Sequence, residues 1–473
     1  MSLIFHLFSL LACHSGSPAA QPNIVMIAMD TVRWDRTSLA DYARPTTPHL
    51  AEFAALDGAT TFTRAYTDAA WSLPAYSSLF SGRGPMEHGV GFSVASLDSG
   101  HATLAEIMAA YGYDTAGFTS GPHLHASTGL SHGFQTYFHD EGLESMTPAI
   151  HRSLHWLDNR DGDSDPFFLF VHGYDAHTPY SAPAAVAELF DPAYDGILHK
   201  GLRDRPAAPC ASGNPTRVCM HDVNVDMGEV KGMATRGLGD SDLEHLRAHY
   251  DASVLGADHQ LGWLLYSLQE RDLLEDSLVI VLSDHGESLG EDGRFGHESE
   301  AGDEVFHVPL VVKTPESTPP ARWGGMVLLS EVLPTLVERI GAQLPAGVKS
   351  NSFIQALGQD KPFPDSDEVI RSASVCCYWV RSAGWELRGW KDPHRLRDFS
   401  RERRWTLHEN GTGPDVLDQH VQVAENLKTY VAGWPERLEN AASVSHGPAG
   451  HNPQMRKMLR EKGYWAPDGG AVR

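Results

Sequence analysis

The stretch PNIVMIAMDT, residues 22–31, decides how the rest of the chain is interpreted. Its apolar run from Ile24 to Met29 is unbroken, whereas a strand with one face in water alternates polar and apolar residues. The run therefore predicts a strand over 23–29 that is covered on both faces, as parallel strands of α/β proteins are. Directly after it stands Asp30, a carboxylate at the point where the strand leaves the core.

Other segments repeat this pattern and set the fold class. Continuous apolar runs predict four more buried strands, at 113–119, 167–172, 278–283 and 310–313. Apolar residues spaced three and four apart predict helices at 104–111, 149–157, 242–270 and 331–340. Strands that alternate with helices predict a layered α/β fold.

Three of these strands run into residues that bind metals or transfer protons. In an open α/β sheet, ligands bind at the carboxyl ends of the strands, so residues that follow different strands are expected to share one pocket. This convergence predicts a functional site at that edge of the sheet. The residues concerned are Asp30 and Thr31 after the first strand, Asp175 and His177 after 167–172, and Asp284, His285 and Glu287 after 278–283.

Asp30, Asp284 and His285 form the predicted metal set. Carboxylate oxygens and an imidazole nitrogen suit Ca²⁺, Mn²⁺ or Zn²⁺, so we expect one divalent ion here. Thr31 is a further candidate, either as a ligand through its hydroxyl or as a structural residue. The alternatives are a turn or helix-capping role for Asp30 and a structural ion pair between Asp284 and His285.

The stretch WSLPAYSSLFSG, residues 71–82, predicts a short helix with a hydroxyl at its start. Pro74 lies in the first turn, where its missing N–H costs nothing, and Gly82 ends the helix. Ser72 at that start is either an N-cap or a nucleophile. The nucleophile interpretation rests on the backbone N–H groups of a helix N-terminus, which stabilise an anionic substrate, and on a nearby metal, which would lower the pKa of the hydroxyl.

Taken together, these segments resemble the sulfatase family of the alkaline phosphatase superfamily over nearly the whole chain. PNIVMIAMDT is similar to the family's opening strand with its first metal aspartate, and SLPAYSSLFSG stands in the place of its nucleophile signature. FFLFVHGYDAHTPY resembles the strand that carries a substrate-binding histidine, here His177. SDHGESLGEDGRFGHE, residues 283–298, resembles the second metal pair followed by a basic residue at the leaving group, here His297.

The resemblance implies an alkaline-phosphatase-like α/β/α sandwich with a mostly parallel central sheet and a small C-terminal α+β subdomain. It also implies a metal-dependent hydrolase of sulfate esters, with a small-molecule or glycan sulfate or phosphate ester as substrate. Ser72, His177 and His297 would be the catalytic residues, and Ser72 would also contact the metal. The ion is Ca²⁺ by family, and the histidine ligand admits Mn²⁺ or Zn²⁺ as well.

Several positions depart from the family pattern. The nucleophile signature of active sulfatases usually ends in arginine, where this chain has Tyr76, which argues against conversion of the serine to formylglycine. Thr31 stands where many members have a second aspartate, and His285 where many have asparagine. The family's lysine–histidine pair is also missing, and His123 or His125 is a candidate substitute unless both are surface residues.

These departures leave three functions open. The first is hydrolysis of sulfate esters. The second is a phosphodiesterase, a phosphonate hydrolase or a phosphoryl-head-group transferase that uses unmodified Ser72. The third is a catalytically inactive, sulfatase-like binding protein. In all three, Glu287 is expected to orient the loop or a ligand histidine, and Asp175 to hydrogen-bond His177 or to bind a second metal.

The chain carries a formal net charge of −24. Such a surface repels nucleic acid and anionic membranes at long range, so no nucleic-acid partner is expected. It also repels anionic substrates, so an anion site must be made positive locally by a metal, by histidines or by a helix N-terminus. The 26 histidines beside 37 lysines and arginines favour the metal and the histidines.

Residues 1–20 are expected to be a targeting segment. The apolar stretch LIFHLFSLLA, residues 3–12, is too short to span a bilayer, and the following Cys13 completes a tetrapeptide, LLAC, that resembles a bacterial lipoprotein cleavage box. We therefore expect export to the bacterial periplasm or anchoring as a lipoprotein through Cys13. An ordinary signal peptide and a cytosolic start are the alternatives.

Composition predicts the remaining boundaries. We expect a catalytic domain over 21–365, with a surface insertion at 191–241 near the mouth of the site. A small antiparallel-sheet subdomain is expected over 366–445, and a tail over 446–473. The predicted elements of this subdomain are strands at 368–378, 379–390 and 404–408 and a helix at 421–440.

The cysteines other than Cys13 allow two interpretations. Cys210 and Cys219 flank a short loop of the insertion and are expected either to close it as a disulfide or, as the rival, to bind zinc. Cys376 and Cys377 are adjacent within a strand-like run and are interpreted as packing residues or unpaired thiols.

Overall fold

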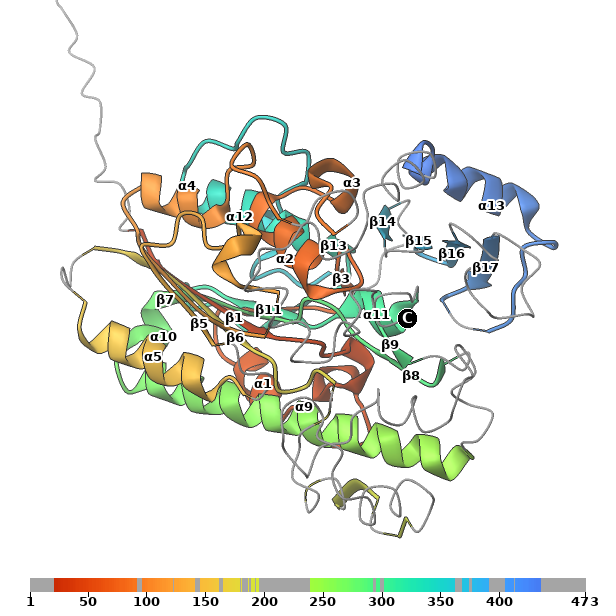
Figure 1. The fold of residues 1–473 in the computed structure, drawn as a ribbon, viewed down its shortest axis with the longest axis horizontal. Coiled ribbons are helices and arrows are strands. Elements are labelled where there is room, and N and C mark those ends of the chain that lie inside the picture. Colours follow the sequence, from red (N-terminus) through yellow and green to blue (C-terminus); the bar gives the residue numbers. More distant parts are fainter. Residues whose placement is uncertain are drawn as a thin grey trace, which may run out of the picture.

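An eight-stranded sheet between two layers of helices forms the body of the protein, as seen in a computed structural model (Figure 1). The fold class predicted from the sequence is confirmed. The structure describes residues 21–91, 96–121, 123–140, 145–160, 165–178, 180, 186, 189–191, 193–194, 239–291, 295–297, 302–361, 368–373, 377–390, 405–411 and 413–434.

The strands of the central sheet come from both halves of the catalytic region. They are β1 (Asn23–Met29), β2 (Ala59–Phe62), β4 (Asp114–Ser120), β5 (Thr136–Asp140), β6 (Phe167–Gly173), β7 (Ser277–Leu282), β11 (Leu310–Lys313) and β12 (Ala321–Trp323). Their order across the sheet is β12-β2-β11-β7-β1-β6-β4-β5. β1 pairs in parallel with β6 and β7, so the carboxyl ends of these three strands lie at one edge.

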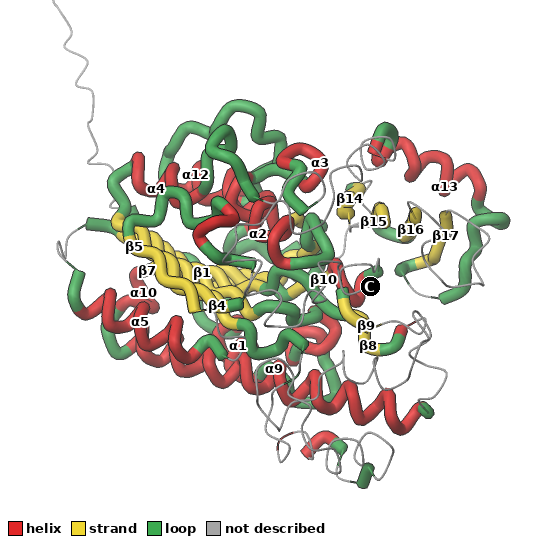
Figure 2. Tube along the Cα trace, in the orientation of Figure 1, coloured by secondary structure: helices red, strands yellow, loops and turns green. Residues whose placement is uncertain are grey.

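Helices cover both faces of the sheet, and Figure 2 shows the strands between the two helical layers. One layer contains α2 (Ser72–Ser81), α3 (Pro85–His88), α4 (Leu104–Ala110) and α12 (Val332–Arg339). The other contains α1 (Pro48–Ala54), α5 (Thr147–Asp158), α9 (Asp240–Gln269) and α10 (Leu273–Asp276).

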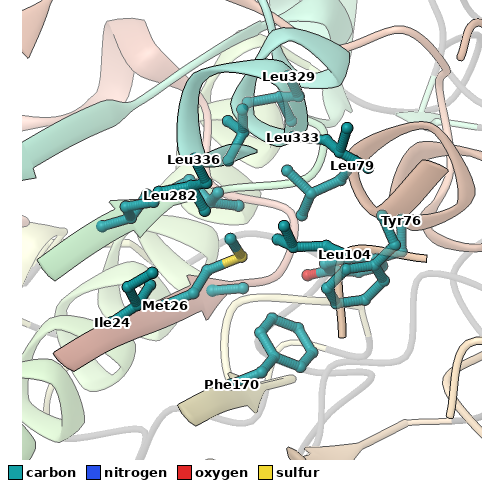
Figure 3. Close-up of a cluster of buried hydrophobic side chains, with 14 of the residues drawn as sticks. Ile24, Met26, Tyr76, Leu79, Leu104, Phe170, Leu282, Leu329, Leu333 and Leu336 are labelled. Carbon is teal, nitrogen blue, oxygen red and sulfur yellow. The ribbon is translucent and has the colours of Figure 1, made fainter. Parts of the chain in front are cut away.

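Alternate side chains of β1 enter two separate hydrophobic cores. Ile24 and Met26 pack under α2 and α12, and Figure 3 shows Leu79 and Leu333 of these helices over the same strands. Val25 and Ile27 face the opposite core, which α9 and α5 close. Burial on both sides explains why the sequence of this strand is apolar throughout.

Several further elements of the structure are short. In a three-stranded sheet, β3 (Ala65–Tyr66) pairs with β10 (His307–Val308) on one side and with β13 (Val327–Leu328) on the other. A hairpin pairs β8 (Ser288–Leu289) with β9 (Phe295–Gly296). α11 covers Asp303–Phe306. Short 3₁₀ helices occupy Trp34–Arg36, Ser38–Ala40, Ala126–Thr128, Leu329–Glu331, Ile354–Ala356 and Thr429–Val431.

A four-stranded antiparallel sheet with its own core follows the central sheet in the chain. It consists of β14 (Val369–Ala373), β15 (Cys377–Ser382), β16 (Trp385–Trp390) and β17 (Trp405–Glu409), with α13 (Val421–Lys428) against it. The predicted break between Tyr378 and Trp379 is wrong. Both residues lie inside β15 and point to opposite faces, so each enters a different core and the run looks continuously aromatic.

Comparison with the sequence predictions shows what an apolar run indicates. The five predicted strands are confirmed to within a residue at each end, and the four predicted helices are confirmed with small shifts. The run at 310–313 was expected among the parallel strands, but β11 is antiparallel to β7 and β2. An apolar run indicates burial on both faces, which any inner strand has, and not the direction of the strand.

The cysteine predictions have a mixed outcome. Cys377 is disulfide-bonded, so its interpretation as an unpaired thiol is wrong. Cys210, Cys219 and Cys376 lie outside the described residues, as do the targeting segment, most of the 191–241 insertion and the tail at 446–473. No helix in the described ranges is long and apolar enough to cross a membrane.

Asp68 connects the chain before α2 to two other parts of the fold. Its buried carboxylate accepts hydrogen bonds from the backbone N–H of Ser330 at 2.9 Å and from the Ser330 hydroxyl at 2.8 Å. Its backbone carbonyl accepts from the N–H of Ala373 in β14 at 3.1 Å. Burial outweighs the hydrogen bonds from Ser330 and raises the pKa of Asp68 to about 7.

We expect Asp68→Asn to flatten the pH dependence of stability. The unfolded chain loses the Asp68 proton near pH 4, whereas the folded protein keeps it to about pH 7, so the free energy of unfolding falls by up to about 1.4 kcal/mol per pH unit between these values. Asparagine cannot ionise, so near pH 8 the free energy of unfolding of the variant should exceed that of the wild type by about 2 kcal/mol or more. Urea unfolding across this pH range measures the two free energies. The exposed Asp57→Asn is the control, and parallel profiles for Asp68→Asn and the wild type would contradict the prediction.

Candidate active site

Polar residues that follow neighbouring strands meet at the carboxyl edge of the sheet. Asp30 directly follows β1, and Asp284 and His285 come just after β7. One ligand atom from each of these three residues lies within 4.8 Å of the other two, and all three residues are fully buried. The structure therefore brings together the three residues that the sequence proposed as a metal set.

The Asp30 carboxylate is held by three donors. Its Oδ1 accepts from the hydroxyl of Thr31, and its Oδ2 accepts from Ser72 Oγ at 3.2 Å and from His172 Nε2 at 3.1 Å. Burial alone would raise its pKa, but the hydrogen bond from His172 and the surrounding histidines hold the pKa well below its usual range. Asp30 therefore carries a negative charge inside the protein.

Asp284 presents a second buried carboxylate to the same space. Its Oδ1 accepts from the backbone N–H of Thr31 at 3.2 Å. Its Oδ2 accepts no hydrogen bond from the described residues and lies 3.4 Å from His285 Nε2. Burial and the neighbouring charge of Asp30 raise the pKa of Asp284 well above its usual range. Two buried carboxylates, one with an oxygen that accepts nothing, fit a divalent cation, which would neutralise both.

His285 is oriented as a ligand through its second ring nitrogen. Its Nδ1 lies 2.9 Å from the carbonyl of Gly286, and because a carbonyl only accepts, Nδ1 carries the hydrogen. Nε2 is then the nitrogen with the lone pair, and it lies 3.2 Å from Ser72 Oγ. Metal-ligating histidines in proteins are commonly fixed in this way by a backbone carbonyl.

Ser72 is the first residue of α2 and faces the metal set. The helix ends at Gly82, whose φ of 64° places it in the left-handed region that favours glycine. The N-cap residue is Trp71, whose side chain makes no capping hydrogen bond with the described residues. The N-cap interpretation of Ser72 is therefore wrong, because its hydroxyl lies 3.2 Å from both Asp30 Oδ2 and His285 Nε2.

His177 and His297 lie beside this set. The ring centroid of His297 is 4.4 Å from that of His285 and 4.9 Å from that of His177. His297 Nδ1 lies 3.2 Å from Glu287 Oε1, and His177 Nδ1 donates to the carbonyl of Thr178. Burial, and then the neighbouring His297, lower the pKa of His177 to about 4. Because Thr178 engages Nδ1 of His177, Nε2 is the nitrogen through which His177 would contact a bound group.

Glu287 contacts His297 and is not part of the metal set. It is buried, and its Oε2 accepts from the hydroxyl of Tyr180 at 2.8 Å. Burial raises the pKa of this carboxyl. Glu287 thus has one oxygen on Tyr180 and the other on His297, whereas the sequence led us to expect that it orients the loop or a ligand histidine.

Thr31 sits in a strained conformation between the two aspartates. Its φ of 66° lies in the left-handed region, which is unusual for a β-branched residue. The turn is fixed by its bonds to both carboxylates and by Tyr250, whose hydroxyl donates to the Thr31 carbonyl at 2.8 Å. Thr31 is thus hydrogen-bonded to both Asp30 and Asp284.

Other candidates lie near the site in different roles. Asp175 accepts from the backbone N–H of Met146 at the start of α5 at 2.7 Å, a contact that neither of its expected roles included. Burial raises its pKa to about 6. The ring of His123 packs edge-on against Trp71, and that of His125 packs against His139. These contacts do not connect either histidine to Asp30.

His172 is the site residue to which the sequence analysis gave no role. It lies in β6 opposite Ala28 of β1 and is fully buried. A signal was present, since a histidine inside an otherwise apolar strand that is covered on both faces must find a polar partner. The sequence could not name that partner, because Asp30 is 142 positions away in the chain.

Comparison with known proteins defines the class to which this fold and site belong. The sulfatase family model matches residues 22–342, and the chain belongs to the sulfatase family. It is therefore a hydrolase of the sulfate-ester type. Arylsulfatase K of Xenopus laevis is 23% identical over 449 residues, which cover 88% of this chain and 80% of that protein.

Solved structures share the alkaline-phosphatase-like fold. A phosphonate monoester hydrolase of Agrobacterium radiobacter superposes with a TM-score of 0.64 at 18% identity, covering 89% of this chain and 95% of that one. A protein solved with its substrate D-glucosamine-2-N,6-O-disulfate superposes with a TM-score of 0.66 at 16% identity, covering 90% of this chain and all of that one.

We expect Asp284→Asn to stabilise the protein in chelator and to abolish its response to metal. Asparagine keeps an acceptor for Thr31 and removes the buried like charge, which should raise the free energy of unfolding at pH 8 by about 1–2 kcal/mol. The gain should shrink as the pH falls, because the raised pKa lets wild-type Asp284 take up a proton. At a metal concentration of roughly 100 times Kd, the free energy of unfolding should rise by about 2.7 kcal/mol in the wild type and stay unchanged in the variant.

Thermal unfolding with and without EDTA measures both effects. The control is Asp251→Asn, because Asp251 is a buried aspartate that pairs with Arg44 at 2.6 Å and should destabilise the protein when neutralised. A lower stability of Asp284→Asn in EDTA, or an unchanged response to metal, would contradict the prediction.

Proposed function

We propose that this sulfatase-family hydrolase is metal-dependent and uses unmodified Ser72 as its nucleophile. The observation that carries the proposal is the position of Ser72 Oγ, 3.2 Å from Asp30 Oδ2 and 3.2 Å from His285 Nε2 at the start of a helix. The hydroxyl thus has a hydrogen-bond acceptor, lies beside the donor set for a cation, and stands at a helix end that favours anions.

Asp30, Asp284 and His285 would hold one divalent ion, which Ser72 would touch. When bound, the ion neutralises the oxygens of the substrate's acid group and lowers the pKa of the serine hydroxyl. The nitrogen ligand favours Mn²⁺ or Zn²⁺, and Ca²⁺ is the alternative that the family suggests. The two buried carboxylates support this proposal, because in the described part of the chain the basic side chains that contact them are histidines, not lysine or arginine.

The proposed reaction proceeds in two steps. Ser72 Oγ attacks the sulfur of the ester after releasing its proton to water, which a lowered pKa of the hydroxyl favours, and an Oγ–S bond forms while the bond from sulfur to the leaving oxygen breaks. His297, oriented by Glu287, supplies the proton to the leaving oxygen. Water then attacks the sulfur of the serine ester, which releases sulfate and restores the hydroxyl.

His297 would be the local donor that the anionic surface of the protein requires, and His177 would become a second donor when a bound anion favours its protonated ring, because its Nδ1 hydrogen is already given to Thr178. With a net charge of −24, the protein as a whole repels a sulfate ester, so binding depends on groups inside the pocket. His177 is 3% exposed and lies against His297, which fits contact with the transferred group rather than with solvent. Loss of one such contact typically costs about 3 kcal/mol in the transition state.

The substrate class is a small-molecule or glycan sulfate ester, and a phosphonate or phosphate ester is the second candidate. The sulfated glucosamine bound to one structural neighbour supports the first, and the phosphonate monoester hydrolase supports the second. Tyr76, in place of the signature arginine, favours an unmodified serine in either case. Mass spectrometry of the peptide with residue 72 decides its state, because formylglycine weighs two hydrogens less than serine.

We also propose that the protein is exported. The apolar stretch that ends at Cys13 supports a signal peptide with lipid attachment at that cysteine. The disulfide at Cys377 supports an oxidising compartment such as the periplasm. Mass analysis of the mature N-terminus distinguishes lipidation at Cys13 from cleavage elsewhere.

We expect Ser72→Ala to lower kcat by at least about a thousandfold while metal affinity stays within a few-fold of wild type. The change removes the attacking oxygen and leaves the three proposed ligands in place. The matched control is Ser77→Ala, a buried serine of the same helix whose hydroxyl donates to the Leu73 carbonyl at 2.7 Å. Hydrolysis of an aryl sulfate and of an aryl phosphonate monoester measures both variants. Full activity of Ser72→Ala would remove this residue from the mechanism, and an inactive, metal-free wild type would indicate a binding protein.

A further inference from the structure

We propose that His172 is a positioning residue that holds Asp30 in the geometry in which it binds the metal and accepts from Ser72. The inference rests on the proposed function, because it concerns the same metal set. His172 lies in β6, and its register opposite Ala28 places it beside the end of β1, two residues before Asp30. It is fully buried, so its ring belongs to the floor of the site and not to its surface.

The direction of the hydrogen bond between His172 and Asp30 is fixed by chemistry. His172 Nε2 lies 3.1 Å from Asp30 Oδ2, and because an ionised carboxylate only accepts, Nε2 carries the hydrogen. His172 Nδ1 is buried and has no hydrogen-bond partner among the described residues. The bond to Asp30 is therefore the contact that satisfies this buried ring.

Aromatic side chains hold the His172 ring in place. The Tyr76 ring stands at 88° to it with a centroid distance of 5.2 Å, and Phe170 and Tyr174 lie at 6.3 Å. Figure 3 shows Tyr76 and Phe170 close together, reaching from α2 and from β6. A ring walled by three aromatic side chains has little freedom to turn away from Asp30.

α2 contacts this arrangement at two points. Ser72 and Tyr76 are four residues apart, so they project from the same face of the helix. Ser72 donates to Asp30 Oδ2, and Tyr76 packs against the histidine that donates to the same oxygen. The nucleophile, the carboxylate and His172 therefore form a closed set, in which His172 fixes the rotation of the Asp30 carboxylate.

A packing role is the simple alternative, since a buried histidine often serves only to fill the core. The two roles differ in what they require of the side chain. Packing requires volume, whereas positioning requires a hydrogen-bond donor at the place of Nε2. Glutamine can place its amide nitrogen near that point, and asparagine, which is shorter, places it near Nδ1 and cannot reach Asp30. Comparing His172→Gln with His172→Asn therefore tests whether the donor must stand at the place of Nε2 or whether any polar side chain suffices.

Isothermal titration of Mn²⁺ into the metal-free full chain tests the proposal. We expect His172→Asn to weaken metal binding by about 10- to 100-fold, the usual effect of losing a hydrogen-bond partner of a ligand, and His172→Gln to stay within a few-fold of wild type. At saturating metal, kcat should fall in His172→Asn while KM stays constant. His139→Asn, at the end of β5 on the same sheet edge, is the control and should bind the metal as wild type does.

Each outcome has a distinct meaning. Equal metal affinity in His172→Asn, His172→Gln and wild type overturns the positioning role and leaves the proposed function standing. Equal loss in both variants also overturns it, because packing would then explain the effect. Absence of metal binding in wild type overturns the proposed function and this inference with it. Should His172→Asn fail to fold by circular dichroism, Tyr76→Leu replaces it, and unchanged affinity in that variant counts against the proposal.

Discussion

The proposed active site depends on two carboxylates, Asp30 and Asp284, that are buried side by side at the ends of adjacent strands. Burial and the charge of Asp30 raise the pKa of Asp284, whereas the hydrogen bond from His172 and the neighbouring histidines hold the pKa of Asp30 low. A fold that only had to be stable would not place them together, because replacing buried charged groups by apolar residues is often neutral or stabilising. The surrounding residues keep the two carboxylates in position. Thr31, at a strained turn, hydrogen-bonds both of them, and the hydroxyl of Tyr250 in α9 donates to the Thr31 carbonyl.

The protein places its reactive groups by the ends of rigid elements. β1 and β7 supply the carboxylates, β6 supplies His172, and α2 supplies Ser72 at its first turn. The hydrophobic cores on both faces of β1 fix the positions of these ends, since its alternate side chains pack into α2 and α12 on one side and α9 on the other. The histidines that would contact substrate come from the segments just after the strands, where substrate specificity can change without disturbing the metal set.

Much of this arrangement could be predicted from the sequence. Apolar runs indicated β1, β6 and β7, and the general rule for open α/β sheets indicated that Asp30, Asp284 and His285 would converge. What could not be predicted depends on contacts between distant segments. β5 is half-buried along its length and has no apolar run, the direction of β11 leaves no trace in its composition, and His172 was read as the last residue of an apolar strand. Its role appears only when β6 is placed beside β1.

The central claim is that a cation unites Asp30, Asp284, His285 and Ser72. The most direct measurement is an anomalous difference map from crystals of the full chain soaked in Mn²⁺. We expect one strong peak within about 2.0–2.4 Å of an oxygen of each aspartate and of His285 Nε2, with Ser72 Oγ in the same coordination shell. A map with no peak between the two carboxylates, although Mn²⁺ is bound elsewhere on the protein, would contradict it.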